Sequence, residues 1–209
     1  MKSPLLIVCP AIVLGLLAQV SVSHADPSLL NGSFEDPVLA PNSIQTGGGT
    51  SWTPNNSSVF IISNNFSNFG TTPFGNQYLG FDKPNAQDEQ TVSGFVAGQD
   101  YLLDLWISDI ANSSNPKLQV LITGAATAGG TFSASQTPSL SFLEVQLPFT
   151  AVSDGSITLD IIDAGSANLA VDNVSIAEAV PEPSTIFAMI LVTGTVATGA
   201  ARKFRATPR

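Results

Sequence analysis

Apolar residues recur at every second position in several stretches of the central part of the chain. Tyr101, Leu103, Leu105 and Ile107 share one face of such a stretch, and the same period appears in residues 118–122, 143–149 and 157–161. This period is typical of strands that bury one face. Turn-forming residues at 112–116, 128–130 and 153–155 separate the stretches. No apolar set at helical spacing is long enough to compete. We therefore predict an all-β fold, an antiparallel β-sandwich of the jelly-roll type.

The N-terminus has the composition of a secretory signal peptide. Lys2 precedes an apolar run over residues 5–20, and Ser23-His24-Ala25 provides small residues around a cleavage site. We predict a signal peptide at 1–25, a mature chain that begins at Asp26, and a β-sandwich domain at 26–178. About 150 residues are enough to bury a core without disulfides.

Two residue types are missing from the predicted mature chain. Cys9 is the only cysteine of the sequence and His24 the only histidine, and both lie in the predicted signal peptide. Their removal excludes disulfides, thiolate nucleophiles and imidazole bases, together with the usual nitrogen and sulfur ligands of zinc. The chemistry that remains involves carboxylates, lysine, tyrosine or calcium.

Charge is distributed unevenly along the chain. Residues 26–179 hold fifteen acidic residues but only two basic ones, Lys83 and Lys117, which gives a formal charge of −13 for this stretch. Such a surface repels phosphate backbones, so no nucleic acid is expected as a partner. It attracts divalent cations and tolerates neutral ligands.

Residues 179–209 form a tripartite segment. The stretch 180–185 contains two prolines and excludes regular structure, residues 186–201 carry no charge, and Arg202, Lys203 and Arg205 follow. The apolar run is short for a membrane span, which needs about 20 residues, although flanking cations can snorkel. A buried core helix is the alternative. Thr193, Thr195, Thr198 and two glycines would make such a helix weak.

This segment resembles a PEP-CTERM sorting signal. The resemblance implies an exported protein of a Gram-negative cell envelope, anchored transiently in the inner membrane by a C-terminal transmembrane helix. It also implies processing by an exosortase and an association with exopolysaccharide. The expected sorting motif consists of Val180, Pro181, Glu182, Pro183 and Ser184.

The central domain resembles the galactose-binding-like jelly rolls, including carbohydrate-binding modules. The resemblance rests on residues 30–35 (LNGSFE), 91–95 (TVSGF), 101–106 (YLLDLW) and 171–176 (VDNVSI). It implies a structural calcium ion, for which Glu35, Asp172 and Asn31 are the candidate ligands, and calcium prefers such oxygen donors. Alternatively, Asp172 ends a hydrogen-bonded strand and Glu35 is a surface acid.

Glycan binding requires an exposed aromatic side chain beside polar groups. Trp52, Tyr78, Asp104 and Trp106 are the candidates, with Gln77 as a further one. Trp106 lies beside Asp104 on the more polar face of its predicted strand, but a core tryptophan fits equally well and is favoured because tryptophan is usually well buried. Trp52 either stacks on a sugar or plugs one end of the sandwich. Residues 42–75 form either plain surface loops with a short strand at 59–62 or a set of binding loops.

Three functions are compatible with these features. The first is a non-catalytic, exported protein whose carbohydrate-binding-like domain acts in an exopolysaccharide or biofilm matrix. The second is a structural envelope protein without glycan binding. The third is a carboxylate-based glycoside hydrolase, which is disfavoured because no local motif pairs two carboxylates. We therefore expect no enzymatic activity.

Overall fold

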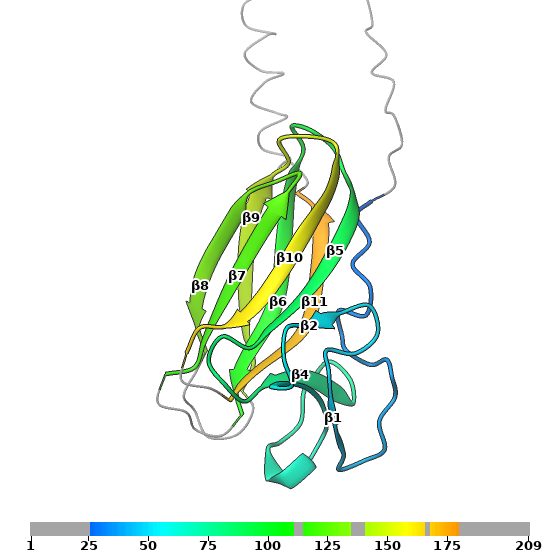
Figure 1. Cartoon of the computed structure of the whole chain (residues 1–209), viewed down its shortest axis with the longest axis vertical. Coiled ribbons are helices and arrows are strands. Elements are labelled where there is room, and N and C mark those ends of the chain that lie inside the picture. Colours follow the sequence, from blue (N-terminus) through cyan, green and yellow to red (C-terminus); the bar gives the residue numbers. More distant parts are fainter. Residues whose placement is uncertain (1–25, 111–114, 135–140, 166–167, 180–209) are drawn as a thin grey trace, which may run out of the picture.

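The described part of the protein is a sandwich of two antiparallel sheets (Figure 1). The computed structural model describes residues 26–110, 115–134, 141–165 and 168–179. One sheet has the order β1 (Ile44–Thr46), β3 (Val59–Ser63), β4 (Gln77–Phe81), β11 (Leu169–Glu178), β6 (Asp100–Asp109) and β9 (Leu143–Thr150). The other has the order β2 (Thr53–Pro54), β5 (Gln87–Phe95), β10 (Gly155–Asp163), β7 (Lys117–Gly124) and β8 (Ala128–Ser133). A short 3-10 helix, η1 (Phe66–Asn68), follows β3.

Successive strands pass from one sheet to the other. After β5 in the five-stranded sheet the chain enters β6 in the six-stranded sheet, returns for β7 and β8, and then alternates through β9, β10 and β11. Every pairing within the two sheets is antiparallel. The predicted antiparallel β-sandwich is confirmed, and this crossing pattern is typical of jelly rolls.

The predicted terminal segments fall outside the described residues. These are the signal peptide (1–25) and the part of the sorting segment from 180 to 209. Within the described ranges, no helix is long and apolar enough to cross a membrane.

The core lies between the two sheets and follows the predicted alternation. The four alternating residues of β6, from Tyr101 to Ile107, are buried, as are those of β7 and β10 that face them across the sandwich. The pattern is weaker on β9, where Leu143 is 48% exposed although Val145 and Phe149 are buried. Among the described residues β9 is the last strand of its sheet, so no further described strand of that sheet covers it.

Residues 128–130 do not form the turn that the sequence predicts. They begin β8 and pair with β7, with Gly129 opposite Leu121 and Gly130 opposite Val120. A Cβ atom on Gly129 would lie 2.9 Å from the carbonyl oxygen of Val120. Glycine is therefore required for close packing inside a strand, a common reason for glycine in a sheet.

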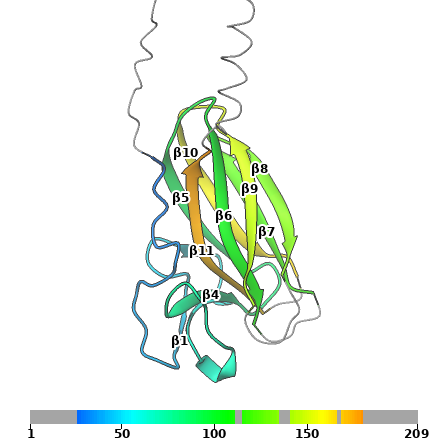
Figure 2. The same cartoon turned by 180° about the vertical axis from the view of Figure 1, so that it is seen from behind.

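The two described ends of the chain lie side by side at one end of the sandwich. In Figures 1 and 2 the first described segment (blue) and the end of β11 (orange) meet there, whereas β1 and η1 lie at the opposite end. The short strand predicted at 59–62 is confirmed as β3.

Candidate functional site

The outer face of β6 carries the polar and aromatic side chains that alternate with the core residues. Asp104 and Trp106 belong to this face. Trp106 lies opposite Glu144 of β9 on one side and Asp172 of β11 on the other. Asp104 lies opposite Gln146 of β9. The sheet therefore brings two of the predicted ligand-binding residues together and adds two that the sequence analysis did not single out.

Trp106 is half-buried on this outer face, so the prediction that it belongs to the sandwich core is wrong. Its ring packs against Phe74, with ring centroids 4.8 Å apart and an interplanar angle of 50°. Phe74 in turn meets Phe142 edge-on at 6.1 Å. Side chains alternate between the two faces along β6. Leu105 points into the core, so Trp106 lies on the outer face together with Asp104.

Three polar side chains, those of Asp104, Glu144 and Gln146, lie next to Trp106 on this outer face. The Nε2 of Gln146 donates hydrogen bonds to the Oδ2 of Asp104, at 3.2 Å, and to the Oε1 of Glu144, at 3.0 Å. A hydrogen bond and charge repulsion from Asp104 raise the pKa of Glu144. Asp104 therefore favours the protonated form of Glu144. Among the described residues, nothing bonds the buried Oδ1 of Asp104.

Trp52 is a plug of the sandwich and not a surface aromatic residue. It is 5% exposed, its ring lies 5.3 Å from that of Phe34, and its Nε1 donates to the carbonyl oxygen of Asn31 at 3.2 Å. Trp52 therefore cannot stack on a sugar without unfolding of the loops around it. Of the two alternatives for Trp52, the one in which it closes an end of the sandwich agrees with this position.

Tyr78 and Gln77 are buried as well. Tyr78 lies beneath the outer-face aromatic residues, with its ring 6.3 Å from that of Phe142, and burial raises the pKa of its hydroxyl. The side-chain amide of Gln77 donates to the carbonyl oxygens of Phe34 and Pro37 at 2.7 and 2.9 Å. Tyr78 supports the site from below, whereas Gln77 holds the N-terminal loop against β4.

Two of the three candidate calcium ligands, Glu35 and Asp172, lie close enough to interact, whereas Asn31 lies apart. Glu35 accepts hydrogen bonds from the backbone of Asn76 and Gln77 at 2.8 and 3.0 Å. Asp172 accepts from the hydroxyl of Thr72 and from the backbone of Asn173. Burial raises the pKa of Asp172 to about 7, and the charge of Glu35 adds to the rise. The carboxylates of Glu35 and Asp172 thus interact with one another.

Asn31 does not join this pair. Its side-chain nitrogen donates to the carbonyl oxygens of Asp36 and Thr50, and its side-chain oxygen accepts from the backbone of Asp36. The side chain therefore stabilises the loop between the first described residues and Trp52. Among the described residues, no group of three or more acidic side chains forms a ready metal cage.

The chain resembles known proteins in its fold and not in its sequence. No protein family and no curated protein matches the chain. Among solved structures, TmCBM61 in complex with β-1,4-galactotriose matches with a TM-score of 0.51 and 14% sequence identity, over 74% of this chain and 100% of that one. The chain has the fold of this carbohydrate-binding module. At 14% identity the likeness concerns the fold alone.

Two further solved structures are similar at lower scores. The CBM22-1 xylan-binding domain of Xyn10C from Paenibacillus barcinonensis matches with 12% identity and a TM-score of 0.47, over 66% of this chain and 93% of that one. The C-terminal CBM6 of LamC from Zobellia galactanivorans matches with 13% identity and a TM-score of 0.47, over 65% and 99%.

Proposed function

We propose that this chain is an exported, non-catalytic protein whose sandwich binds a neutral polysaccharide on the outer face of the six-stranded sheet. One observation carries the proposal: Trp106 is half-buried beside Phe74, with Asp104, Glu144 and Gln146 next to it. Sugar rings offer C–H faces that stack on aromatic side chains, and hydroxyl groups that bond to carboxylates and amides.

The position of these groups suits recognition. β6 lies between β11 and β9 in the sheet, so Trp106 and Asp104 project from a strand that is hydrogen-bonded on both sides. A buried acceptor without a partner costs about 1–3 kcal/mol. A sugar hydroxyl that donates to the Oδ1 of Asp104 would remove this cost, which supports a ligand at this place.

The fold and the carboxyl geometry support binding over hydrolysis. A protein with the same fold, TmCBM61, is known in complex with β-1,4-galactotriose. Gln146 bridges Asp104 and Glu144, because its Nε2 donates to both carboxyl groups, at 3.2 and 3.0 Å. A glycosidase needs the space between its two carboxyl groups for the sugar or a water molecule, so we propose a binding module and no enzyme.

The predicted sorting signal also agrees with this role. A PEP-CTERM segment read by an exosortase would place the domain in the cell envelope or outside it, within an exopolysaccharide or biofilm matrix. A tether that leaves at the end of β11 would direct β1 and η1 away from the membrane (Figure 1). The outer face of the six-stranded sheet would then remain accessible to a polysaccharide.

Replacing Trp106 by alanine is expected to weaken glycan binding by about 30-fold or more, because a stacked aromatic anchor contributes about 2 kcal/mol or more. Calorimetry of residues 26–179 with β-1,4-galactan and xylan provides the measurement. Leu121→Ala, an exposed apolar truncation on the other sheet, is the matched control and should bind normally. If Trp106→Ala bound as tightly as the wild type, the site would lie elsewhere. If the wild type bound no polysaccharide, a structural role in the matrix would replace the proposal.

We also propose that Glu35 and Asp172 hold a structural calcium ion. Their carboxylates interact, and the hydroxyl of Thr72 bonds directly to Asp172, so oxygen donors of the kind that calcium prefers converge there. Asn31 is left out because its amide is already bonded. When bound, the ion would neutralise two acidic groups and tie the N-terminal loop to β11.

Calcium at about 100 times its dissociation constant is expected to stabilise the domain by about 2.7 kcal/mol, a rise in melting temperature of several degrees. Glu35→Gln should remove this response. Glu178→Gln, the same change at an exposed position of β11, should keep it. A melting temperature that does not respond to calcium in the wild type would show that the two acids are hydrogen-bond acceptors only.

A further inference from the structure

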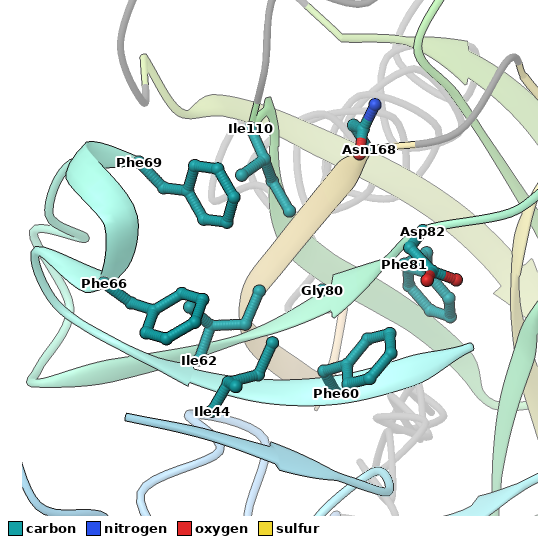
Figure 3. A pocket seen from close by; sticks show the side chains of 10 residues that line it. All are labelled: Ile44, Phe60, Ile62, Phe66, Phe69, Gly80, Phe81, Asp82, Ile110 and Asn168. Carbon is teal, nitrogen blue, oxygen red and sulfur yellow. The ribbon is translucent and has the colours of Figure 1, made fainter. Parts of the chain in front are cut away.

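A hollow lies on the outer face of the same sheet, at the end away from the described chain termini (Figure 3). Its volume is about 190 Å³. Seven apolar side chains from β1, β3, β4, the η1 turn and the end of β6 line it: Ile44, Phe60, Ile62, Phe66, Phe69, Phe81 and Ile110. Figure 3 shows that Ile110 and the rings of Phe66 and Phe69 point into the same space from different elements.

The turn that carries two of these rings is strained. Asn65 has φ 63° and Ser67 has φ 48°, both in the left-handed region that non-glycine residues rarely adopt. Such residues cost about 1–3 kcal/mol each, and they gather at sites where the strain has a use. Here the strained turn leaves Phe66 and Phe69 half-buried, with ring centroids 5.8 Å apart, instead of burying them in the core.

Size and charge restrict what the hollow can hold. A cavity of about 150 Å³ lined by leucine, isoleucine and phenylalanine takes up benzene, whereas sites for drug-sized ligands measure about 300–1,000 Å³. The hollow therefore suits one six-membered ring. Its polar lining consists of the Asn168 side chain and the Asp82 carboxylate, which is exposed at the rim. With a formal charge of −13 over residues 26–179, an anionic ligand such as a fatty acid is repelled.

The hollow and the proposed sugar site lie on the same face of the six-stranded sheet. Trp106 and Asp172 are opposite one another on β6 and β11, and Tyr78, Ile62 and Ile44 are opposite one another on β4, β3 and β1. Trp106 and Ile62 stand three strands apart, about 14 Å at the usual strand spacing. Ile62 and Tyr78 form one apolar cluster with Ile110 and Ala170, and Phe66, Phe69 and Phe142 pack against this cluster. A short oligosaccharide spans this separation.

We propose that the hollow binds a neutral aromatic ring carried by the polysaccharide that Trp106 engages. The ring packs edge-on against Phe60, Phe66 and Phe69, as aromatic pairs prefer, and its polar linkage lies at the rim beside Asn168. That the ring is borne by a glycan rests on the proposed function, whereas the capacity of the hollow for a neutral ring does not.

Benzyl alcohol titrated into residues 26–179 labelled with ¹⁵N tests the hollow by itself. We expect saturable shifts at Gly80, Ile110 and Asn168, at least tenfold weaker binding of benzoate, and at least fivefold weaker binding of benzyl alcohol to Phe66→Ala. Gly80→Ala provides a second variant, because a Cβ there would lie 2.4 Å from the Cδ1 of Ile62 and displace it into the hollow. Trp106→Ala should bind benzyl alcohol normally. An absence of shifts at these residues in the wild type would overturn the site.

Benzyl β-1,4-galactotrioside then distinguishes a glycan-borne ring from a free one. We expect it to bind at least tenfold more tightly than benzyl alcohol, and Phe66→Ala to lose this gain while keeping the affinity for plain galactotriose. Equal affinities of benzyl alcohol and the benzyl glycoside would overturn the glycan-borne ring. Failure of Trp106→Ala to weaken binding of plain galactotriose would instead contradict the proposed sugar site, so the two failures are distinguishable.

Discussion

Replacing Trp52 by alanine is expected to lower the free energy of unfolding by about 3–5 kcal/mol, the usual cost of truncating a buried tryptophan. The side chain is 5% exposed, packs on Phe34, and donates a hydrogen bond to the carbonyl oxygen of Asn31. Truncation leaves a cavity where the N-terminal loop meets the sheets. Chemical denaturation of residues 26–179, followed by circular dichroism, measures the loss.

Trp106→Ala is the matched control for this prediction, because it is the same substitution at the other tryptophan of the chain. Trp106 is half-buried on an outer face, so its removal should cost clearly less stability than that of Trp52. Equal losses for the two variants would contradict the assignment of Trp52 to the core and of Trp106 to the surface.

Stability is expected to fall as the pH rises from 5 to 8, by about 7 kcal/mol. Burial raises the pKa of Asp88 to about 7 and that of Asp163 to about 6. Both side chains are fully buried, and a Cβ placed on Gly48 would lie 1.7 Å from the Oδ2 of Asp88, so this carboxyl packs directly on backbone. Among the described residues neither oxygen of Asp88 has a hydrogen-bond partner.

The sign follows from proton binding. The unfolded chain releases these protons near pH 4, whereas the folded chain holds them up to about pH 6–7. Between pH 4 and 7 the folded state therefore binds more protons, and stability decreases with rising pH. From pH 5 to pH 8, Asp88 contributes about 2.7 kcal/mol and Asp163 about 1.4 kcal/mol, at 1.36 kcal/mol per pH unit. Asp172, whose pKa burial raises to about 7, contributes about 2.7 kcal/mol more when no calcium is bound.

Thermal melts at pH 5 and pH 8 in the presence of a calcium chelator measure this effect, and the melting temperature should drop by about 15–25 °C. Asp88→Asn should reduce the drop by about two fifths because the amide does not titrate. Glu178→Gln, at an exposed position, should leave it unchanged. A melting temperature that rises from pH 5 to pH 8 would show that Asp88 and Asp163 are ionised in the folded protein.

Much of the fold follows from local patterns. The alternation in β6, β7 and β10 predicts both the strands and their buried faces, because a period of two places each side chain on a definite face. The glycines at 129 and 130 mislead, since the same residue that permits a turn also permits two strands to approach closely. Local sequence does not separate these two uses, which depend on the partner strand.

The candidate site was less predictable. Parity places Asp104 and Trp106 on one face of β6, but whether that face is covered depends on Phe74 and Phe142, which come from remote segments. Glu144 and Gln146 join the site through the register of β6 with β9, strands some 40 residues apart. Their alternation with Val145 signals an outer-face position, yet the register that brings them to Trp106 is set by the whole sheet.

Intrinsic fluorescence of a Trp52→Phe variant tests the central claim most directly. The chain contains two tryptophans, so this variant leaves Trp106 as the sole reporter, and phenylalanine keeps an aromatic ring at the plug. Titration of residues 26–179 with β-1,4-galactan is predicted to give a saturable change in the emission of Trp106, which Gln146→Ala weakens. An emission that stays constant while calorimetry detects binding would contradict a sugar site at Trp106.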